Sequence, residues 1–362
     1  MSMQSITTKQ MYEVIQHNVM RMNEVCFFWG SAGIGKTDTG RHAVESLGAH
    51  FWDFRPGQHE SVDFRGLPNF KTVDDVEMAV WSMPDLLPFE GNPKAPTDRP
   101  IGLFADEFNG STSNPVFTML MQLFNERMVA GRKLLPNVRI FAAGNREGDK
   151  GTATRTPFTV NNRGTHFEIV SCVDTWSEWA ASVGVPPVII AFLQFRKPLL
   201  NMFDPTKNEK VVATPRTWAK AVNYYADSQL PRWLRDASIA GCVGAGPAAE
   251  LFAFEKIWET LKDYMPRIRR EPTTVELPSG EQALGTTYAL AVAISGEMSA
   301  ANISTFHSFL CRLSPEFAIL AWQMATAREE RMVKDNQLRP DQSLFTTKEF
   351  IDFSKKFKAV FN

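Results

Sequence analysis

The chain has 362 residues, of which 44% are hydrophobic and 22% are charged, and its 39 basic and 40 acidic side chains give a net charge of −1. This length is sufficient for two domains, or for one domain with a large extension, and the composition is that of a globular protein. The near balance of charge argues against a surface built as a whole to hold nucleic acid, although it allows a local basic patch.

Neither the apolar runs nor the cysteines indicate a membrane or an oxidising compartment. No apolar run approaches the roughly 18 residues of a membrane span, and the N-terminus has no signal-peptide pattern. The four cysteines are far apart, with no histidine at metal-binding spacing, so we expect them to be reduced and mostly buried. We therefore expect a cytoplasmic protein without a membrane partner.

Strand-like and helix-like segments alternate through the first 172 residues. Short apolar runs indicate strands at 25–29, 50–54, 101–105, 137–143 and 165–170. Helices are expected at 8–20, 37–47 and 114–128. The irregular segment 55–100 contains two runs, 69–73 and 77–81, that can pair as a hairpin, and a connection of this length is expected to be functional. This order predicts an α/β sandwich with a parallel five-stranded sheet flanked by helices.

Beyond residue 172 the pattern becomes helical. Helices are expected at 176–183, 187–195, 215–227, 230–241, 247–265, 284–298, 303–313, 315–331 and 347–361. A polar, proline-bearing segment at 267–280, which begins with Arg267, Arg269 and Arg270, is expected to be a linker or loop. We expect three parts: an α/β domain over 1–172, an α-helical lid over 173–245 and a mostly helical C-terminal extension over 246–362.

The sequence G-S-A-G-I-G-K-T at 30–37 lies between the first predicted strand and the helix after it, which is the context of a phosphate loop. The glycines let successive backbone N–H groups point at phosphate oxygens, and the helix N-terminus adds its positive dipole end. Lys36 supplies charge to the β- and γ-phosphates, and the Thr37 hydroxyl ligates Mg²⁺. The expected nucleotide-binding residues are Gly30, Ser31, Ala32, Gly33, Ile34, Gly35, Lys36, Thr37 and Asp38.

Two carboxylates, Asp106 and Glu107, follow the apolar strand at 101–105. Open α/β sheets bind ligands at this edge, so Asp106 is expected to hold Mg²⁺ and Glu107 to polarise the water that attacks the γ-phosphate. Asn145 ends the run R-I-F-A-A-G-N, where its amide can orient that water. Alone, the acidic pair would be a solvated strand end and the asparagine a turn residue, but the preceding phosphate loop favours the functional interpretation.

These motifs, followed by N-N-R-G at 161–164 and T-P-R-T-W at 214–218, resemble in type and order those of AAA+ ATPases. The segment V-D-F-R-G-L-P at 62–68, the hairpin-like residues after it and the run at 126–136 are similar to the MoxR-like, or dynein-related, branch of bacteria and phages. The resemblance covers about residues 8–240. It implies an AAA+ module with two hairpin insertions that face the central channel of a ring, near which it would place Arg127, Arg132 and Lys133.

The resemblance also implies roles for two arginines. Arg163 matches the arginine finger, which reaches the nucleotide of a neighbouring subunit and stabilises transition-state charge. Gly164 stands where a phenylalanine usually follows that arginine, so Arg155 is the alternative finger. Arg216 matches the sensor arginine of the lid, which contacts the γ-phosphate and couples hydrolysis to lid motion. The alternative without a catalytic role is that each arginine forms a surface ion pair, which contributes little to stability.

The resemblance implies Mg²⁺-dependent hydrolysis of ATP to ADP and phosphate by a homo-oligomer, expected to be a hexameric ring. In this family the energy remodels a protein partner, as a chaperone does, or inserts a cofactor, often with a von Willebrand factor A domain protein. The alternatives are a nucleic-acid motor, of the DNA translocase or helicase type, and a nucleotide-gated switch that barely hydrolyses. The near-neutral charge favours a protein partner over DNA, and the presence of Glu107 as a base argues against the switch.

Overall fold

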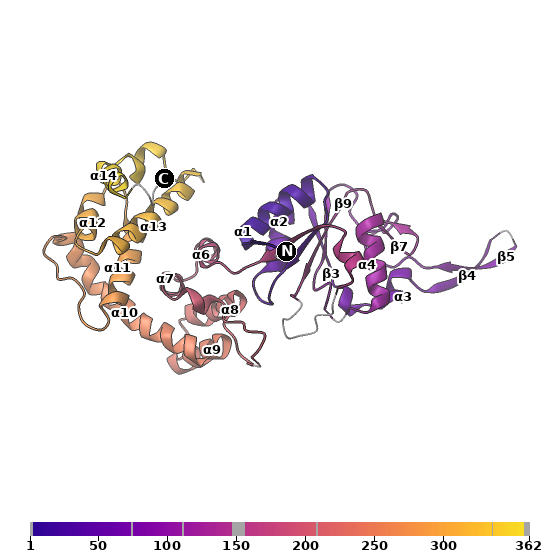
Figure 1. Cartoon of the computed structure of the whole chain (residues 1–362), viewed down its shortest axis with the longest axis horizontal. Coiled ribbons are helices and arrows are strands. Elements are labelled where there is room, and N and C mark those ends of the chain that lie inside the picture. The colour runs from indigo at the N-terminus through magenta and orange to yellow at the C-terminus, as the bar shows by residue number, and fades with distance from the viewer. Residues whose placement is uncertain are drawn as a thin grey trace. The chain divides into compact units, whose positions relative to one another are not determined.

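The computed structural model describes residues 3–73, 75–110, 112–146, 156–207, 209–334 and 336–357. The chain divides into two compact units, of which the first comprises Met1–Trp179, Pro198–Leu230 and Gly241–Val243 and the second comprises Ala180–Lys197, Pro231–Ala240 and Gly244–Asn362. Within the described ranges every strand belongs to the first unit, and the second is helical (Figure 1). This confirms the expected α/β module with a helical C-terminal region, while the boundaries at 172 and 245 stay predictions.

A six-stranded parallel sheet forms the centre of the first unit. Its strands are β1 (Gln4–Ile6), β2 (Cys26–Trp29), β3 (His50–Phe54), β6 (Ile101–Ala105), β9 (Val138–Gly144) and β10 (Thr165–Ile169). Their order is β1-β10-β2-β9-β6-β3, and all pairings are parallel. The five predicted strands are therefore confirmed, but the sheet has one strand more than predicted. Strand β1 was missed because three residues are too few to show an alternating pattern.

Helices cover both faces of this sheet. They are α1 (Thr8–Val14), which continues as a π-helix (Ile15–Arg21), α2 (Lys36–Glu45), α3 (Ser61–Arg65), α4 (Asn114–Glu126) and α5 (Phe158–Asn161). Phe28 and Phe104 belong to the core cluster on the side of α1 and α2, whereas Phe27 and Leu103 belong to the cluster on the side of α3, α4 and α5. Successive strand residues point to opposite faces, so a sheet buried on both sides requires the continuous apolar runs seen in the sequence.

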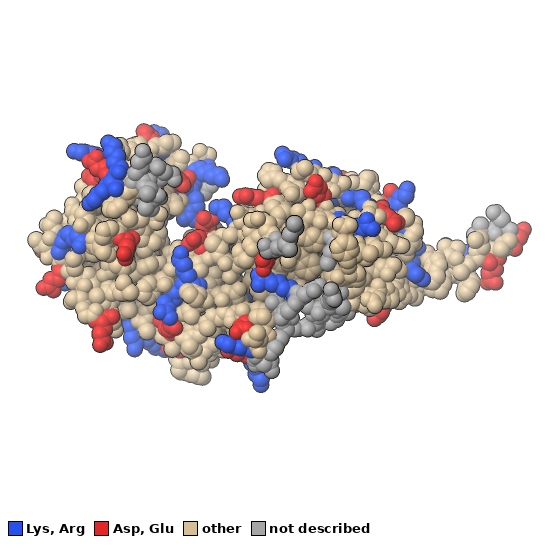
Figure 2. Space-filling view, in the orientation of Figure 1, with Lys and Arg blue, Asp and Glu red and all other residues tan. Residues whose placement is uncertain are grey.

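Two antiparallel hairpins lie outside the parallel sheet. The longer one pairs β4 (Pro68–Val73) with β5 (Val76–Trp81), as the sequence predicted, and the shorter one pairs β7 (Met128–Val129) with β8 (Arg132–Lys133). Figure 1 shows the long hairpin extending away from the sheet, and Figure 2 shows acidic side chains near its tip. Arg132 Nη2 donates to the carbonyl groups of Trp81 and Ser82 at 2.8 and 3.1 Å, which ties the base of the long hairpin to the short one.

The remaining helices begin with α6 (Val173–Ser182), which runs from the first unit into the second, and α8 (Pro215–Ala226), which belongs to the first. The others are α7 (Pro187–Phe195), α9 (Arg232–Val243), α10 (Ala245–Arg270), α11 (Ala283–Glu297), α12 (Ile303–Leu310), α13 (Pro315–Lys334) and α14 (Lys348–Lys356). No helix within the described ranges combines the length and apolar character needed to cross a bilayer. The four cysteines are free; Cys26 and Cys242 are buried, while Cys311 is exposed.

Helix α10 differs from the prediction at its C-terminal end. It passes through Pro266 and ends at Arg270, so the three arginines expected in a loop form its last turn. Leu261, Met265 and Ile268 are buried and keep one face of the helix apolar to its end. Cations at a helix C-terminus also interact favourably with the helix dipole. These two features outweigh the single backbone hydrogen bond that a proline removes.

Candidate functional site

The candidate site lies where β2, β6 and β9 end. After β2 the chain passes to the outer strand β3, returns through β6 and β9, and then crosses β2 to form β10. Strand β2 is therefore the point at which the connections diverge to opposite sides. In an open parallel sheet, a crevice for ligands forms outside the carboxyl ends of the strands at this position.

Two glycines give the loop after β2 its shape. Gly33 and Gly35 have φ angles of +81° and +95°, in the left-handed region that favours glycine, and α2 begins directly after Gly35. Ile34, between them, is 4% exposed and belongs to the core on the α1 and α2 side. The loop is thus anchored by one apolar side chain while its backbone turns around the start of α2.

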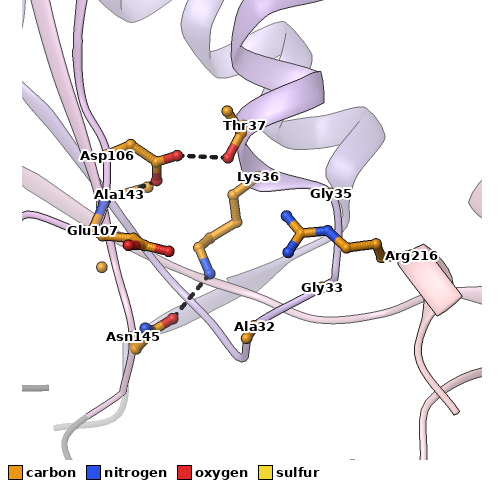
Figure 3. A pocket seen from close by; sticks show the side chains of 11 residues that line it. Ala32, Gly33, Gly35, Lys36, Thr37, Asp106, Glu107, Ala143, Asn145 and Arg216 are labelled. Carbon is orange, nitrogen blue, oxygen red and sulfur yellow. Dashed lines mark hydrogen bonds between the residues drawn. The ribbon is translucent and has the colours of Figure 1, made fainter. Parts of the chain in front are cut away.

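Lys36 is the buried cation inside this loop. It is 8% exposed, and its Nζ donates to the carbonyl groups of Gly30 and Ser31 at 2.6 and 3.0 Å. The same nitrogen lies 3.4 Å from Oδ1 of Asn145, at the end of β9 (Figure 3). The structure therefore brings together the lysine of the first motif and the asparagine of the third, which are far apart in the sequence.

Thr37 and Asp106 form the second pair at the site. The Thr37 hydroxyl donates to Asp106 Oδ2 at 2.6 Å, and the N–H of Glu107 donates to Asp106 Oδ1 at 2.9 Å. Asp106 is 4% exposed. The alcohol oxygen of Thr37, at the start of α2, and the carboxylate of Asp106, after β6, are ligands of the kind that Mg²⁺ prefers, so these two residues fit a magnesium ion. Together with the glycine loop and Lys36, they also fit the phosphates of a nucleotide.

Glu107 begins the turn after β6. Its φ is +49°, and its carbonyl accepts the N–H of Gly110 at 2.7 Å. The residue is exposed, and Figure 3 shows its carboxylate directed toward the space beside Lys36 and Asn145. The left-handed backbone thus turns this carboxylate toward the site, although such a conformation is uncommon for a residue with a side chain.

Asn109 is a site residue that sequence reasoning missed. It is fully buried, its Nδ2 donates to the carbonyl of Asn145 at 2.9 Å, and its Oδ1 accepts the N–H of Asn145 at 3.0 Å. This side chain therefore holds the backbone of Asn145 in place. In the sequence it follows the acidic pair as part of F-N-G, a pattern that reads as an ordinary turn.

Helix α8 contributes the last side chain of the pocket. The backbone N–H of Arg216 donates to the carbonyl of Gly33 at 3.0 Å. A Cβ added at Gly33 would lie 2.9 Å from Oγ1 of Thr214, the residue that caps α8. The N-terminus of α8 thus packs directly on the glycine loop, and Figure 3 shows the Arg216 guanidinium directed toward Lys36.

The pocket is lined by residues from all four predicted segments. They are Ala32, Gly33, Gly35, Lys36, Thr37, Asp106, Glu107, Ala143, Gly144, Asn145 and Arg216. Of the remaining predicted residues, Gly30 and Ser31 face Lys36 through their carbonyl groups, Ile34 is in the core, and Asp38 is exposed in the first turn of α2.

The two candidates for the arginine finger lie elsewhere. Arg163 is exposed, does not line the pocket, and donates from Nη1 to Asn125 Oδ1 on α4 at 3.1 Å. Arg155 lies outside the residues that the structure describes.

A third carboxylate and a cation lie beside Asp106 at the end of β3. Arg55 Nη2 is 3.8 Å from Asp53 Oδ2 and 4.0 Å from Asp106 Oδ2. Burial raises the pKa of Asp53 above its ordinary value, and the charge of Asp106 adds to this effect, while Arg55 and Arg41 oppose it. No motif in the sequence indicates this group, because charged residues after a strand are common.

Comparison with known proteins leaves the family open. No family model and no curated protein matches the chain. Among solved structures, the Holliday junction branch migration motor RuvB of Thermotoga maritima is 11% identical, with a TM-score of 0.38 over 84% of this chain and 86% of that one. NtrX from Brucella abortus is 14% identical, with a TM-score of 0.35 over 81% of this chain and 69% of that one.

Proposed function

We propose that the chain is an AAA+ ATPase that binds ATP with Mg²⁺ and hydrolyses it to ADP and phosphate. One observation carries this proposal: Lys36, Thr37 and Asp106, with Glu107 and Asn145, meet at a single pocket although they come from three separate segments. A chance phosphate-loop motif would not be accompanied by a metal-binding pair, a carboxylate and an amide at the same strand ends.

Each of these side chains has a distinct part in the reaction. Lys36 neutralises the β- and γ-phosphates, and Thr37 and Asp106 hold Mg²⁺, which when bound offsets phosphate charge. Glu107 accepts a proton from the water whose oxygen attacks the γ-phosphorus, while the bond to the ADP oxygen breaks. Asn145 orients that water. Arg216 adds positive charge at the γ-phosphate and, through its N–H bond to Gly33, links α8 to the loop.

The direct test is the ATPase rate of Glu107→Gln beside that of the parent. We expect the substitution to lower kcat by about 10²-fold or more, since a positioned general base contributes about that much, while Mg²⁺-dependent ATP binding stays near the parent value. Lys36→Ala is the matched comparison, because it should lower binding itself. ATP hydrolysis that survives both substitutions would show that the activity lies elsewhere.

We further propose that the chain works as a homo-oligomeric ring, expected to be a hexamer, in which Arg163 acts on the nucleotide of a neighbouring subunit. The support is its placement: Arg163 is exposed and lies outside the pocket of its own chain, as a residue that acts in trans must. Arg155 stays the alternative finger. Until the subunits assemble, transition-state charge lacks this cation, so isolated subunits should hydrolyse ATP slowly.

The long hairpin supports a protein partner, and hence a cytoplasmic MoxR-like remodeller with a chaperone-type role. Phe70, Val76 and Met78 are 68%, 60% and 50% exposed, which is unusual for apolar side chains of this size. The pairing of Thr72 with Glu77 and of Val73 with Val76 puts Asp75 and Glu77 at the tip, where their charges would repel the phosphates of a nucleic acid. A von Willebrand factor A domain protein is the partner that the family resemblance suggests.

The basic residues in and beside the short hairpin, β7 and β8, give little support to the alternative, a DNA translocase or helicase. Arg132 donates to the base of the long hairpin, and Arg127 bonds the carbonyl of Val138 and, at 2.9 Å, Asn23 Oδ1. Of the three basic residues expected near a channel, Lys133 is the exposed one. Stimulation of the ATPase by DNA that disappears as salt is raised would nevertheless favour the motor.

A further inference from the structure

Arg55 is a cation beside the proposed magnesium site, and none of the roles above uses it. It follows β3 directly, and the register Phe54 with Ala105 makes it the cross-strand neighbour of Asp106. Its Nη2 lies 4.0 Å from Asp106 Oδ2, the same oxygen that accepts the Thr37 hydroxyl. A side-chain cation thus faces the carboxylate oxygen that a magnesium ion would use.

The backbone around Arg55 holds it at this distance. The N–H of Asp106 donates to the carbonyl of Phe54 at 2.8 Å, and the N–H of Gln58 donates to the carbonyl of Arg55 at 3.1 Å. A Cβ added at Gly57 would lie 1.8 Å from the carbonyl oxygen of Gly110, so the segments after β3 and β6 touch backbone to backbone. Arg55 is therefore placed by the same contacts that place Asp106.

The Asp106 side chain is buried, whereas the two charged side chains beside it are partly exposed. The Asp106 side chain is 5% exposed, whereas the Arg55 and Asp53 side chains are 39% and 31% exposed. A buried carboxylate without a cation is costly, so Asp106 gains from a positive charge while no metal is bound. Arg55 is the more exposed member of the pair, and Asp53, 3.8 Å from the same nitrogen, is a second carboxylate within its reach.

We propose that Arg55 is a positioning residue that shares its charge between Asp106 and Asp53 until Mg²⁺ and nucleotide bind, and that it then pairs with Asp53 alone. The inference rests on the proposed ATPase function. Thr37 and Asp106 would hold Mg²⁺, and the guanidinium of Arg55 would then be repelled by the metal charge and lose its place as a partner of Asp106. Arg55 thereby competes with the metal, and it also begins the segment that leads through α3 to the long hairpin.

The experiment is a Mg²⁺ titration of the binding of a fluorescent ADP analogue to the full chain. We expect Arg55→Gln to need about fivefold less Mg²⁺ for half-maximal binding, the factor that corresponds to a partly exposed ion pair. Arg55→Lys, which keeps the charge, should stay near the parent. Arg41→Gln is the control: Arg41 also acts on Asp53, but it pairs with Glu45 at 3.6 Å and lies over the Phe51 ring.

The outcomes separate this inference from the proposed function. If the parent shows no Mg²⁺-dependent binding of the analogue, the ATPase proposal fails and the role of Arg55 fails with it. If the parent binds but Arg55→Gln has the same Mg²⁺ requirement, or a higher one, the competition by Arg55 alone is overturned. If Arg55→Gln does not fold, Arg55→Lys decides instead. A Mg²⁺ requirement for Arg55→Lys that differs several-fold from that of the parent, in either direction, also overturns the competition between Arg55 and Mg²⁺.

Discussion

Asn109 is fully buried and exchanges two hydrogen bonds with the backbone of Asn145, so it holds the end of β9 against the turn after β6. Asn109→Ala leaves one N–H and one carbonyl without partners. We expect the free energy of unfolding to fall by about 1–3 kcal/mol. We also expect kcat for ATP hydrolysis to fall about tenfold, with less change in ATP affinity, because Asn145 orients the water. Chemical unfolding and steady-state kinetics measure the two effects.

Asn92 provides the matched control for this prediction. It is also buried, donates to the carbonyl of Leu87 at 2.9 Å and accepts the N–H of Lys94 at 3.0 Å, and it does not line the pocket. Asn92→Ala should therefore lose stability but keep kcat. If both variants lower kcat equally, Asn109 acts through general stability and not through Asn145.

Among the contacts between elements, the one between the glycine loop and α8 joins two sides of the pocket. Gly33→Ala forces a side chain into a left-handed φ and toward Thr214, so we expect it to lower the affinity for ADP by about tenfold, the equivalent of about 1.4 kcal/mol. Gly48 has a φ of +71° with no atom within 4 Å of an added Cβ. Gly48→Ala should share the loss of stability and keep the ADP affinity, which nucleotide titration can check. Equal loss of affinity in both would rule out a specific loop–α8 effect.

The packing of α12, α13 and α14 in the second unit predicts a dependence on pH. The ring of His307 contacts Trp322 and Phe353, and burial lowers its pKa from 6.5, with Lys356 adding to the effect and Glu349 and Asp352 opposing it. Protonation therefore favours the unfolded chain, so this contribution to stability is present above a pH of about 6.5 and is lost as the pH falls toward the folded pKa.

The measurement is the unfolding temperature at pH 7.5 and 5.5 for the parent and for His307→Phe. We expect the parent to lose more stability than the variant between these two values. An equal loss in both would show that other groups set the response to acid.

The elements that the sequence predicted well are those with a strong physical signal. Strands buried on both faces read as continuous apolar runs, and the phosphate loop carries glycines whose φ angles no other residue adopts easily. The elements that it missed are short or depend on tertiary contacts. Strand β1 has three residues, α10 continues past a proline because its face stays buried, and Asn109 and Arg55 act through neighbours distant in sequence.

In the whole assembly, we expect the subunits to complete each other's sites. Glu107 and Asn145 line the pocket of their own chain, whereas Arg163 lies outside it and is exposed. An arginine supplied in trans can change the rate of phosphoryl transfer by about 10³-fold or more. Activity should therefore depend on assembly, and two variants defective in different subunits of the same interface should complement each other.

The most direct measurement is the ATPase rate per subunit against protein concentration, for the parent, for Glu107→Gln, for Arg163→Ala, and for an equal mixture of the two variants. We expect the parent rate to rise with assembly and each variant alone to be nearly inactive. The mixture should recover part of the activity, because one subunit supplies Arg163 to the intact Glu107 of the other. A parent rate that is independent of concentration down to monomeric conditions, with no recovery in the mixture, would show that the site is not shared between subunits.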